Sequence, residues 1–110
     1  MRILNVAVAL ALFAVPRVAG AAAVGDPQLG LVYAKKVCGK CHAVVAGDKA
    51  SPDIMAPNFA AVADTPGMTD RALVVWLQNS DHATMPNLMI APGDLDNIVA
   101  YIMSLRREID

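Results

Sequence analysis

The stretch that decides the fold is Cys38-Gly39-Lys40-Cys41-His42. On a helical turn, residues three apart share one face, with their β-carbons about 5–6 Å apart. Two thiols at this spacing can reach the vinyl groups along one edge of a porphyrin and become thioethers, and His42, next in the chain, can place an imidazole nitrogen on the iron. C-x-x-C-H is the attachment sequence for c-type haem. We therefore predict one haem c, bound covalently through Cys38 and Cys41.

Other chemistries for the two cysteines suit the sequence less well. A redox-active C-x-x-C is expected in a βαβ context and gives no role to the adjacent histidine. Zinc needs four ligands, and besides the two cysteines the sequence offers only His42 and His82, the first of which neighbours Cys41 awkwardly for a tetrahedral site. An iron–sulfur cluster needs four cysteines. A redox thiol pair and a zinc site are the alternatives to haem.

The N-terminal segment, residues 1–23, has the composition of a cleavable export signal. Arg2 supplies a positive charge, residues 3–15 form a mostly apolar core, and small residues follow. We expect cleavage after Ala21 or Ala23. A retained membrane anchor is the alternative, but spanning a bilayer takes about 20 apolar residues, and an arginine interrupts this run.

The rest of the chain, residues 24–110, is short enough for one domain. The whole chain has a net charge of −1. Without the two arginines of the signal, seven Lys and Arg stand against ten Asp and Glu, a charge of −3. This balance excludes a nucleic-acid binder that uses a basic patch, and it gives no polybasic membrane signal. Only 5% of the residues are aromatic, so we expect a bound haem to supply much of the interior.

Apolar periodicity and capping residues predict an all-α fold, because no stretch alternates in the manner of a β-strand. We expect three to four helices wrapped around the haem. Their ranges are 27–37, a short helix over 59–63, a helix that begins after Thr69 and ends near Gln78, and 92–107. The irregular segment over residues 43–66 is typical of a chain that wraps a ligand.

Several apolar side chains are expected to face inward. Leu73, Trp76 and Leu77 lie at positions i, i+3 and i+4 of the third helix and predict a buried stripe. Trp76 is expected in the core, and a sharper hypothesis is that it lines the haem pocket. The inward-facing residues expected in the irregular segment are Met55, Phe59 and Val62.

A haem iron bound by His42 has a second axial position, for which the sequence offers several candidate ligands. Met85 stands in a segment without apolar periodicity and precedes Pro86, which stiffens the backbone. A loop can lie across a flat macrocycle, so we predict Met85 as the iron ligand opposite His42. His82 and Met89 are the alternative ligands, and an open iron site is a further one.

These features together resemble the class I monohaem cytochromes c, of the small bacterial periplasmic kind. The resemblance is carried by C-G-K-C-H at residues 38–42, by Met85-Pro86 and by the segment I-V-A-Y-I-M-S-L at residues 98–105, and it covers about residues 30–105. It implies the cytochrome c fold, with His42 and Met85 as the axial ligands, and a periplasmic location.

The family also suggests roles for residues outside the motif. In these proteins a glycine eight residues before the first cysteine packs against an aromatic residue of the last helix, and Gly30 and Tyr101 match those positions. A proline after the haem histidine offers its carbonyl to the other imidazole nitrogen. Pro57 matches that proline, although it follows Ala56 where the family usually has glycine.

The resemblance implies an electron carrier rather than an enzyme. With both axial positions filled by protein, the iron would change oxidation state without binding a substrate, and no catalytic acid–base pair is visible. We expect a monomer that meets its redox donors and acceptors in small, transient contacts. Lys35, Lys36 and Lys40 form either an ordinary solvated face or a positive rim that orients an acidic partner. The alternatives are a haem subunit of a larger oxidoreductase and, if the methionine ligand is labile, a haem protein that reacts with gases or peroxide.

Overall fold

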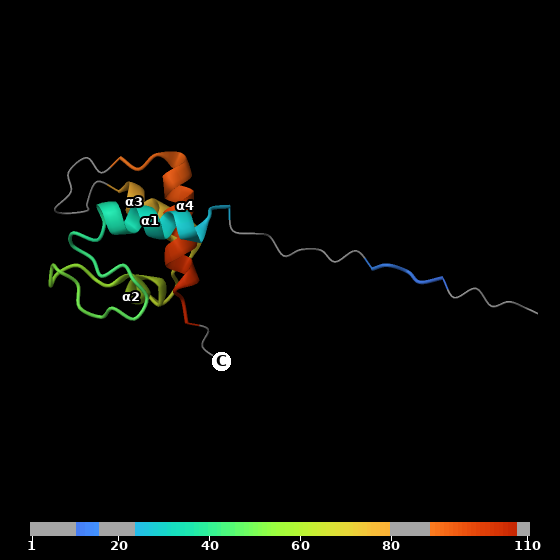
Figure 1. The fold of residues 1–110 in the computed structure, drawn as a ribbon, viewed down its shortest axis with the longest axis horizontal. Coiled ribbons are helices and arrows are strands. Elements are labelled where there is room, and N and C mark those ends of the chain that lie inside the picture. Colours follow the sequence, from blue (N-terminus) through green and yellow to red (C-terminus); the bar gives the residue numbers. More distant parts are fainter. Residues whose placement is uncertain (1–10, 16–23, 80–88, 108–110) are drawn as a thin grey trace, which may run out of the picture.

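The computed structural model describes residues 11–15, 24–79 and 89–107. This part of the chain contains four helices and no strand, so the predicted all-α class is confirmed. The helices are α1 (Pro27–Val37), α2 (Phe59–Ala63), α3 (Asp70–Gln78) and α4 (Pro92–Ser104) (Figure 1). Within the described ranges, no helix has the length and apolar character needed to cross a membrane. Most of the predicted signal segment lies outside the described residues.

Three of the helices begin at side-chain caps. Asp26 and Asn58 each accept a hydrogen bond of 2.8 Å from a backbone N–H in the first turn of α1 and α2, and Thr69 accepts one of 3.1 Å at the start of α3. These bonds satisfy N–H groups that have no partner inside a helix. Helix α4 follows Ala91 without a side-chain cap and starts with Pro92, whose fixed φ suits the first helical position.

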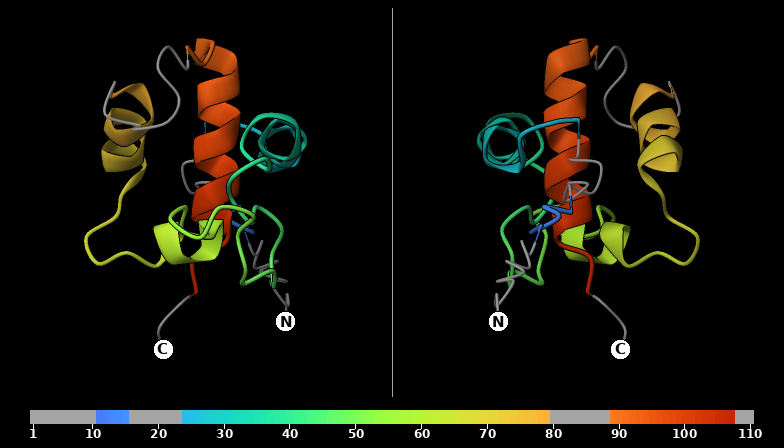
Figure 2. Two further views of the ribbon diagram at one scale, coloured as in Figure 1. Left: turned by 90° about the vertical axis from the view of Figure 1, so that its left-hand side faces the viewer. Right: turned by 90° about the vertical axis from the view of Figure 1, so that its right-hand side faces the viewer.

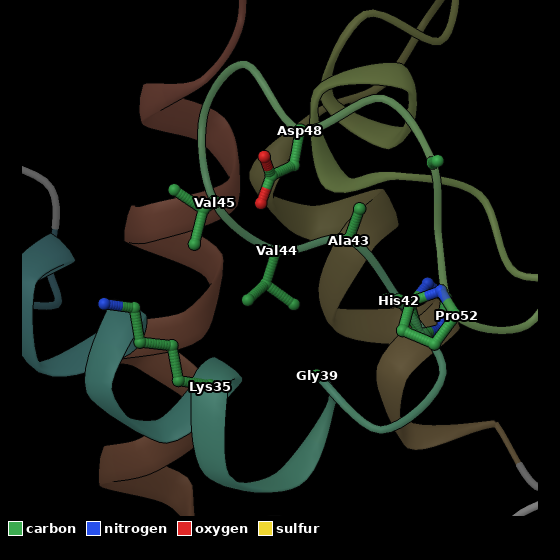
Figure 3. Close-up of a pocket in the computed structure, with 9 residues that line it drawn as sticks. Lys35, Gly39, His42, Ala43, Val44, Val45, Asp48 and Pro52 are labelled. Carbon is green, nitrogen blue, oxygen red and sulfur yellow. The ribbon is translucent and has the colours of Figure 1, made fainter.

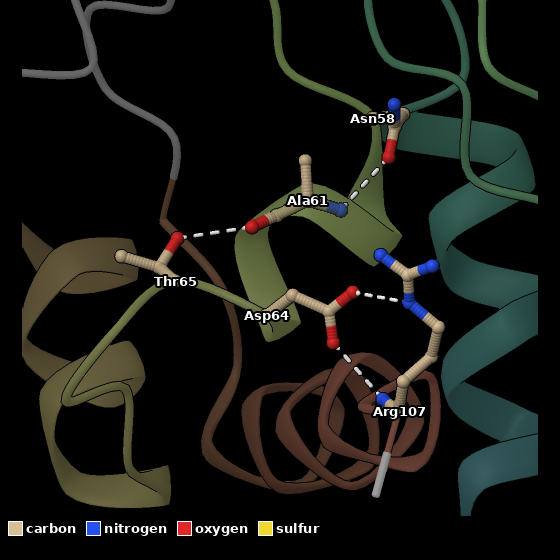
Figure 4. Close-up of polar contacts among 5 residues, drawn as sticks. All are labelled: Asn58, Ala61, Asp64, Thr65 and Arg107. Atoms are coloured by element: carbon tan, nitrogen blue, oxygen red, sulfur yellow. Dashed lines mark hydrogen bonds and ion pairs between the residues drawn. The ribbon is translucent and has the colours of Figure 1, made fainter. Parts of the chain in front are cut away.

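Helix α4 ends at Ser104, and the prediction that it continues to Arg107 is wrong. The arginines beyond its end bind elsewhere. The backbone N–H of Arg107 donates to Asp64 Oδ1 at 2.9 Å, and its Nε donates to Oδ2 at 3.0 Å (Figure 4). Arg106 Nη1 donates to the Met68 carbonyl at 3.1 Å. These contacts replace further helical turns and tie the chain after α4 to the region around α2.

Helix α4 is the element that the other helices share. It packs against α1, α3 and α2, whereas those three make no comparable contact with one another in the described part of the chain. Figure 2 shows α1 on one side of α4 and α3 on the other, with α2 near its C-terminal end. The buried core accordingly draws on all four helices and on the segments between them: Ala34, Val44, Phe59, Ala63, Met68, Leu73, Leu95, Ile98, Val99, Tyr101 and Ile102.

A glycine allows α1 to cross α4 closely. A β-carbon on Gly30 would lie 2.0 Å from the Asn97 carbonyl oxygen and 2.7 Å from the Tyr101 β-carbon. The contact that the family resemblance implied for Gly30 and Tyr101 is therefore present. The two helices are also joined at the N-terminus of α1, where the Asp26 N–H donates to Asn97 Oδ1 at 2.8 Å.

Two of the expected core residues are exposed. Trp76 is 60% exposed and Met55 is 85% exposed, so their predicted places in the core are wrong. Among the helices, α3 packs against α4 alone, so only a narrow stripe of its surface is covered. Leu73 lies at the centre of this stripe and is buried. Trp76 lies about 60° around the helix from Leu73 and therefore falls outside the stripe. Phe59 is buried as expected, and Val62 and Leu77 are half-buried.

We predict that Gly30→Ala destabilises the protein by about 3 kcal/mol, because the added methyl group would force two helix backbones apart. The matched control is Gly93→Ala, since a β-carbon on Gly93 would meet no atom within 4 Å. That substitution should change the free energy of unfolding by less than about 1 kcal/mol, in the stabilising direction. Urea unfolding of both variants measures the difference. Equal stability of the two variants would contradict the close crossing.

We also predict a pH-dependent contribution from Asp64. The backbone and side-chain hydrogen bonds from Arg107 lower the pKa of the Asp64 carboxyl. A carboxyl with a lowered folded-state pKa stabilises the fold above its unfolded pKa, about 3.9, and this stabilisation is lost as the pH falls through the folded value. Asp64→Asn should therefore lower the melting temperature near neutral pH, by an amount that shrinks below about pH 4.

The control for this experiment is Asp48→Asn, which removes an exposed carboxylate that forms no ion pair in the described part of the chain. Its melting temperature should follow that of the wild type more closely across the same pH range. A decrease in the melting temperature of Asp64→Asn that stays constant between pH 7 and pH 3 would refute the lowered pKa of Asp64.

Candidate haem-attachment site

The C-x-x-C-H motif continues directly from the end of α1. Cys38 caps the helix, and its N–H donates to the Ala34 carbonyl at 2.9 Å. The N–H groups of Cys41 and His42 then both donate to the Cys38 carbonyl, at 3.1 and 2.9 Å. The motif is thus folded into tight turns, which hold two half-buried free cysteines and the histidine at one end of the helix.

The imidazole of His42 is held by a backbone carbonyl. Its Nδ1 lies 2.7 Å from the Pro57 carbonyl oxygen, which is the contact that the resemblance implied for Pro57. A carbonyl can only accept, so Nδ1 carries the proton and donates it. In the neutral ring the lone pair then belongs to Nε2, the form in which histidine binds a metal. Phe59 packs beside the same ring, with the centroids 5.4 Å apart and the planes tilted by 51°.

Pro57 is itself placed by its neighbours in the chain. Asn58 caps α2 and also donates from Nδ2 to the Lys49 carbonyl at 3.3 Å. The N–H of Phe59 donates to the Ala43 carbonyl at 3.0 Å. The segment before α2 is therefore bound to the segment that follows His42, and this pairing brings the Pro57 carbonyl to the histidine.

The irregular chain between the motif and α2 folds back and is hydrogen-bonded to the motif and to the residue that follows it. The Asp53 N–H donates to the Cys41 carbonyl at 3.0 Å, and the Ser51 hydroxyl accepts from the Ala43 N–H at 2.9 Å. No role for Ser51 was predicted from the sequence. The turn-forming run Ser51-Pro52-Asp53 was the available signal, but its partner could not be read from the sequence.

Burial changes the chemistry of the first cysteine. It raises the pKa of the Cys38 thiol to about 11, so this thiol is protonated at neutral pH. Redox-active cysteines and metal-binding cysteines act as thiolates, and their pKa values are usually lowered. Cys38 therefore has the wrong ionisation for the redox-thiol alternative.

The described residues contain no group of three or more His, Cys, Asp or Glu side chains arranged to hold a metal ion. They do not form the four-ligand zinc site considered above. His82, the one further histidine available to such a site, lies outside the described residues.

The predicted distal ligand, Met85, also lies outside the described residues, as do His82 and Pro86. The structure does describe four other methionines, of which Met103 is half-buried within α4. Met68 is buried in the core, at 4% exposure, and Met55 and Met89 are exposed. The choice of Met85 as the iron ligand stays a prediction, as does the hypothesis that Trp76 lines the haem pocket.

A shallow pocket of about 280 Å³ lies beside the motif. Figure 3 shows the chain from His42 to Asp48 passing beside Lys35, near the end of α1, and beside Gly39, which follows the helix. Pockets for small organic ligands usually measure about 300–1,000 Å³ and enclose most of the ligand. This pocket is smaller and open to solvent, so we assign no ligand to it.

Comparison of the chain with protein families, with curated proteins and with solved structures finds no match. The functional assignment therefore depends on the residues of this site and on the resemblance carried by its motifs.

Proposed function

We propose that this chain is an exported, class I c-type cytochrome that carries single electrons between redox proteins. In this proposal one haem is attached through Cys38 and Cys41 within a cytochrome c fold. His42 is the proximal iron ligand and Met85 the distal one. The observation that carries the proposal is the hydrogen bond of 2.7 Å between His42 Nδ1 and the Pro57 carbonyl.

This hydrogen bond matters because it selects the tautomer and the orientation of the ring. Histidines that bind metals usually donate their other N–H to a carbonyl or a carboxylate, and this bond raises the basicity of the ligating nitrogen. The bond therefore supports a role for His42 as an axial ligand.

The protonated state of Cys38 also supports covalent attachment. In thioether formation a thiol adds across a vinyl double bond: sulfur bonds to one vinyl carbon, and the thiol hydrogen goes to the other. The addition consumes one thiol for each vinyl group and needs no oxidant. The resulting thioether carries no charge, so it suits a half-buried position in which burial raises the pKa of the thiol.

The proposed ligand set favours electron transfer over catalysis. A bound haem supplies one-electron iron chemistry. His42 and Met85 would occupy both axial positions, so no position would remain for a substrate. Lys35, Lys36 and Lys40 are exposed close to the motif and can orient an acidic redox partner. The rate of such an encounter falls as the salt concentration rises.

The direct test is the mass and colour of the protein after export from a bacterial host that attaches haem c. We expect the mass of the processed polypeptide plus one haem, no titratable thiol, and the absorption bands of a low-spin haem. A Cys38→Ser/Cys41→Ser double variant, expressed in the same way, is the control and should lack covalent haem. Colourless wild-type protein with two free thiols would refute the proposal.

The distal ligand has its own test. Replacing a thioether ligand removes a group that favours ferrous iron, and axial ligands move haem potentials over a range of about 0.8 V. We therefore expect Met85→Ala to lower the midpoint potential by on the order of 100 mV and to let the iron bind cyanide or carbon monoxide. Redox titration and absorption spectroscopy measure both effects.

Met89→Ala is the matched control for this variant, because Met89 is 90% exposed and is the alternative methionine ligand in the same region. It should keep the wild-type potential and stay closed to carbon monoxide. An unchanged potential in Met85→Ala, or a lowered one in Met89→Ala, would overturn the choice of ligand.

A further inference from the structure

The two residues that follow His42 are tied to three separate parts of the chain. The Ala43 N–H donates to the Ser51 hydroxyl at 2.9 Å, and the Ala43 carbonyl accepts from the Phe59 N–H at 3.0 Å. The Val44 carbonyl accepts from the Tyr101 hydroxyl at 2.5 Å. Ala43 and Val44 are both buried. The backbone next to the predicted iron ligand is thus held from several directions.

Tyr101 is the most distant of these partners in the sequence. It belongs to α4, its side chain is buried, and its β-carbon packs against Gly30. Burial raises the pKa of Tyr101, so its hydroxyl stays protonated and donates. A buried carbonyl needs a hydrogen-bond partner, and the Tyr101 hydroxyl is the donor that the structure provides for Val44.

The contacts continue from Val44 to the histidine ring. Ala43, the residue before Val44, is hydrogen-bonded to the backbone of Phe59, whose ring packs on the imidazole of His42. Two residues before Phe59, the Pro57 carbonyl accepts the proton of His42 Nδ1. A shift of the Val44 carbonyl would therefore move both the peptide that carries His42 and the segment that holds its ring.

We infer that Tyr101 is a positioning residue for His42, and that its hydroxyl, acting through the Val44 carbonyl, sets the strength of the bond between His42 Nδ1 and Pro57. The inference rests on the proposed function, because it concerns the electron density that His42 gives to an iron. A stronger bond at Nδ1 makes the imidazole a better donor, which favours ferric iron. Weakening that bond should raise the potential.

The test compares Tyr101→Phe with the wild-type holoprotein by two measurements. The midpoint potential should rise in the variant. The exchange rate of the His42 Nδ1 proton with solvent, followed by ¹⁵N-edited NMR of the reduced protein, should increase at least tenfold. Ser51→Ala removes the hydroxyl that accepts from Ala43 on the other side of the same dipeptide, and it should change both quantities in the same direction.

Thr65→Val is the matched control, since it removes a hydroxyl that also donates to a backbone carbonyl, that of Ala61 at 3.0 Å, but that makes no bond to His42, Ala43 or Val44. It should leave the potential and the exchange rate unchanged. A lower melting temperature in Tyr101→Phe, with unchanged potential and exchange rate, would show a purely structural role and overturn the inference.

The outcomes separate this inference from the proposed function. Wild-type protein that carries haem, with variants that differ from it in neither measurement, overturns the inference alone. Wild-type protein without haem overturns both. If Tyr101→Phe fails to fold, Ser51→Ala decides: a raised potential with faster exchange supports the positioning network, and unchanged values refute it.

Discussion

The described structure depends on the close crossing of α1 and α4 at Gly30. Any side chain there would collide with the backbone carbonyl of Asn97, so the two helices can meet at this distance only because the residue has no β-carbon. Glycine lowers the stability of a helix by about 1 kcal/mol relative to alanine. That cost is offset by the packing it permits, since α4 is the helix that α1, α2 and α3 all contact.

The crossing also places the functional motif. Because α1 is held against α4, its last turn brings the cysteines and His42 to one side of the core, next to the residues that α4 presents. Tyr101 then reaches the peptide after the motif from α4, and Phe59 reaches it from α2. The backbone next to His42 is therefore held by residues of α2 and α4, although the motif itself spans five residues. Under the inference drawn above, a change in α4 alters the environment of His42, which lies more than fifty residues away.

Two of the interactions around the motif bear on chemistry as well as on stability. The Pro57 carbonyl selects the tautomer of His42, and burial keeps the Cys38 thiol protonated. Under the proposed function, the tautomer suits a histidine that binds iron through Nε2, and the protonated thiol is the form that adds to a vinyl group to give a neutral thioether. A protonated thiol is not the state expected of a thiolate-based redox pair.

The sequence by itself determined the features that depend on neighbouring residues. The caps Asp26 and Thr69 and the starting prolines marked where helices begin, because capping is a contact between residues two or three positions apart. The C-x-x-C-H spacing predicts haem attachment by the same kind of local geometry, and this stays a prediction. Tertiary structure decided which helix faces were buried by neighbouring helices and where the last helix ended. Trp76 lies outside the core because α3 has one helical neighbour, and α4 stops at Ser104 because Arg106 and Arg107 bind Met68 and Asp64. The bond from Tyr101 to Val44 joins residues that only folding brings together, so no local pattern could reveal it.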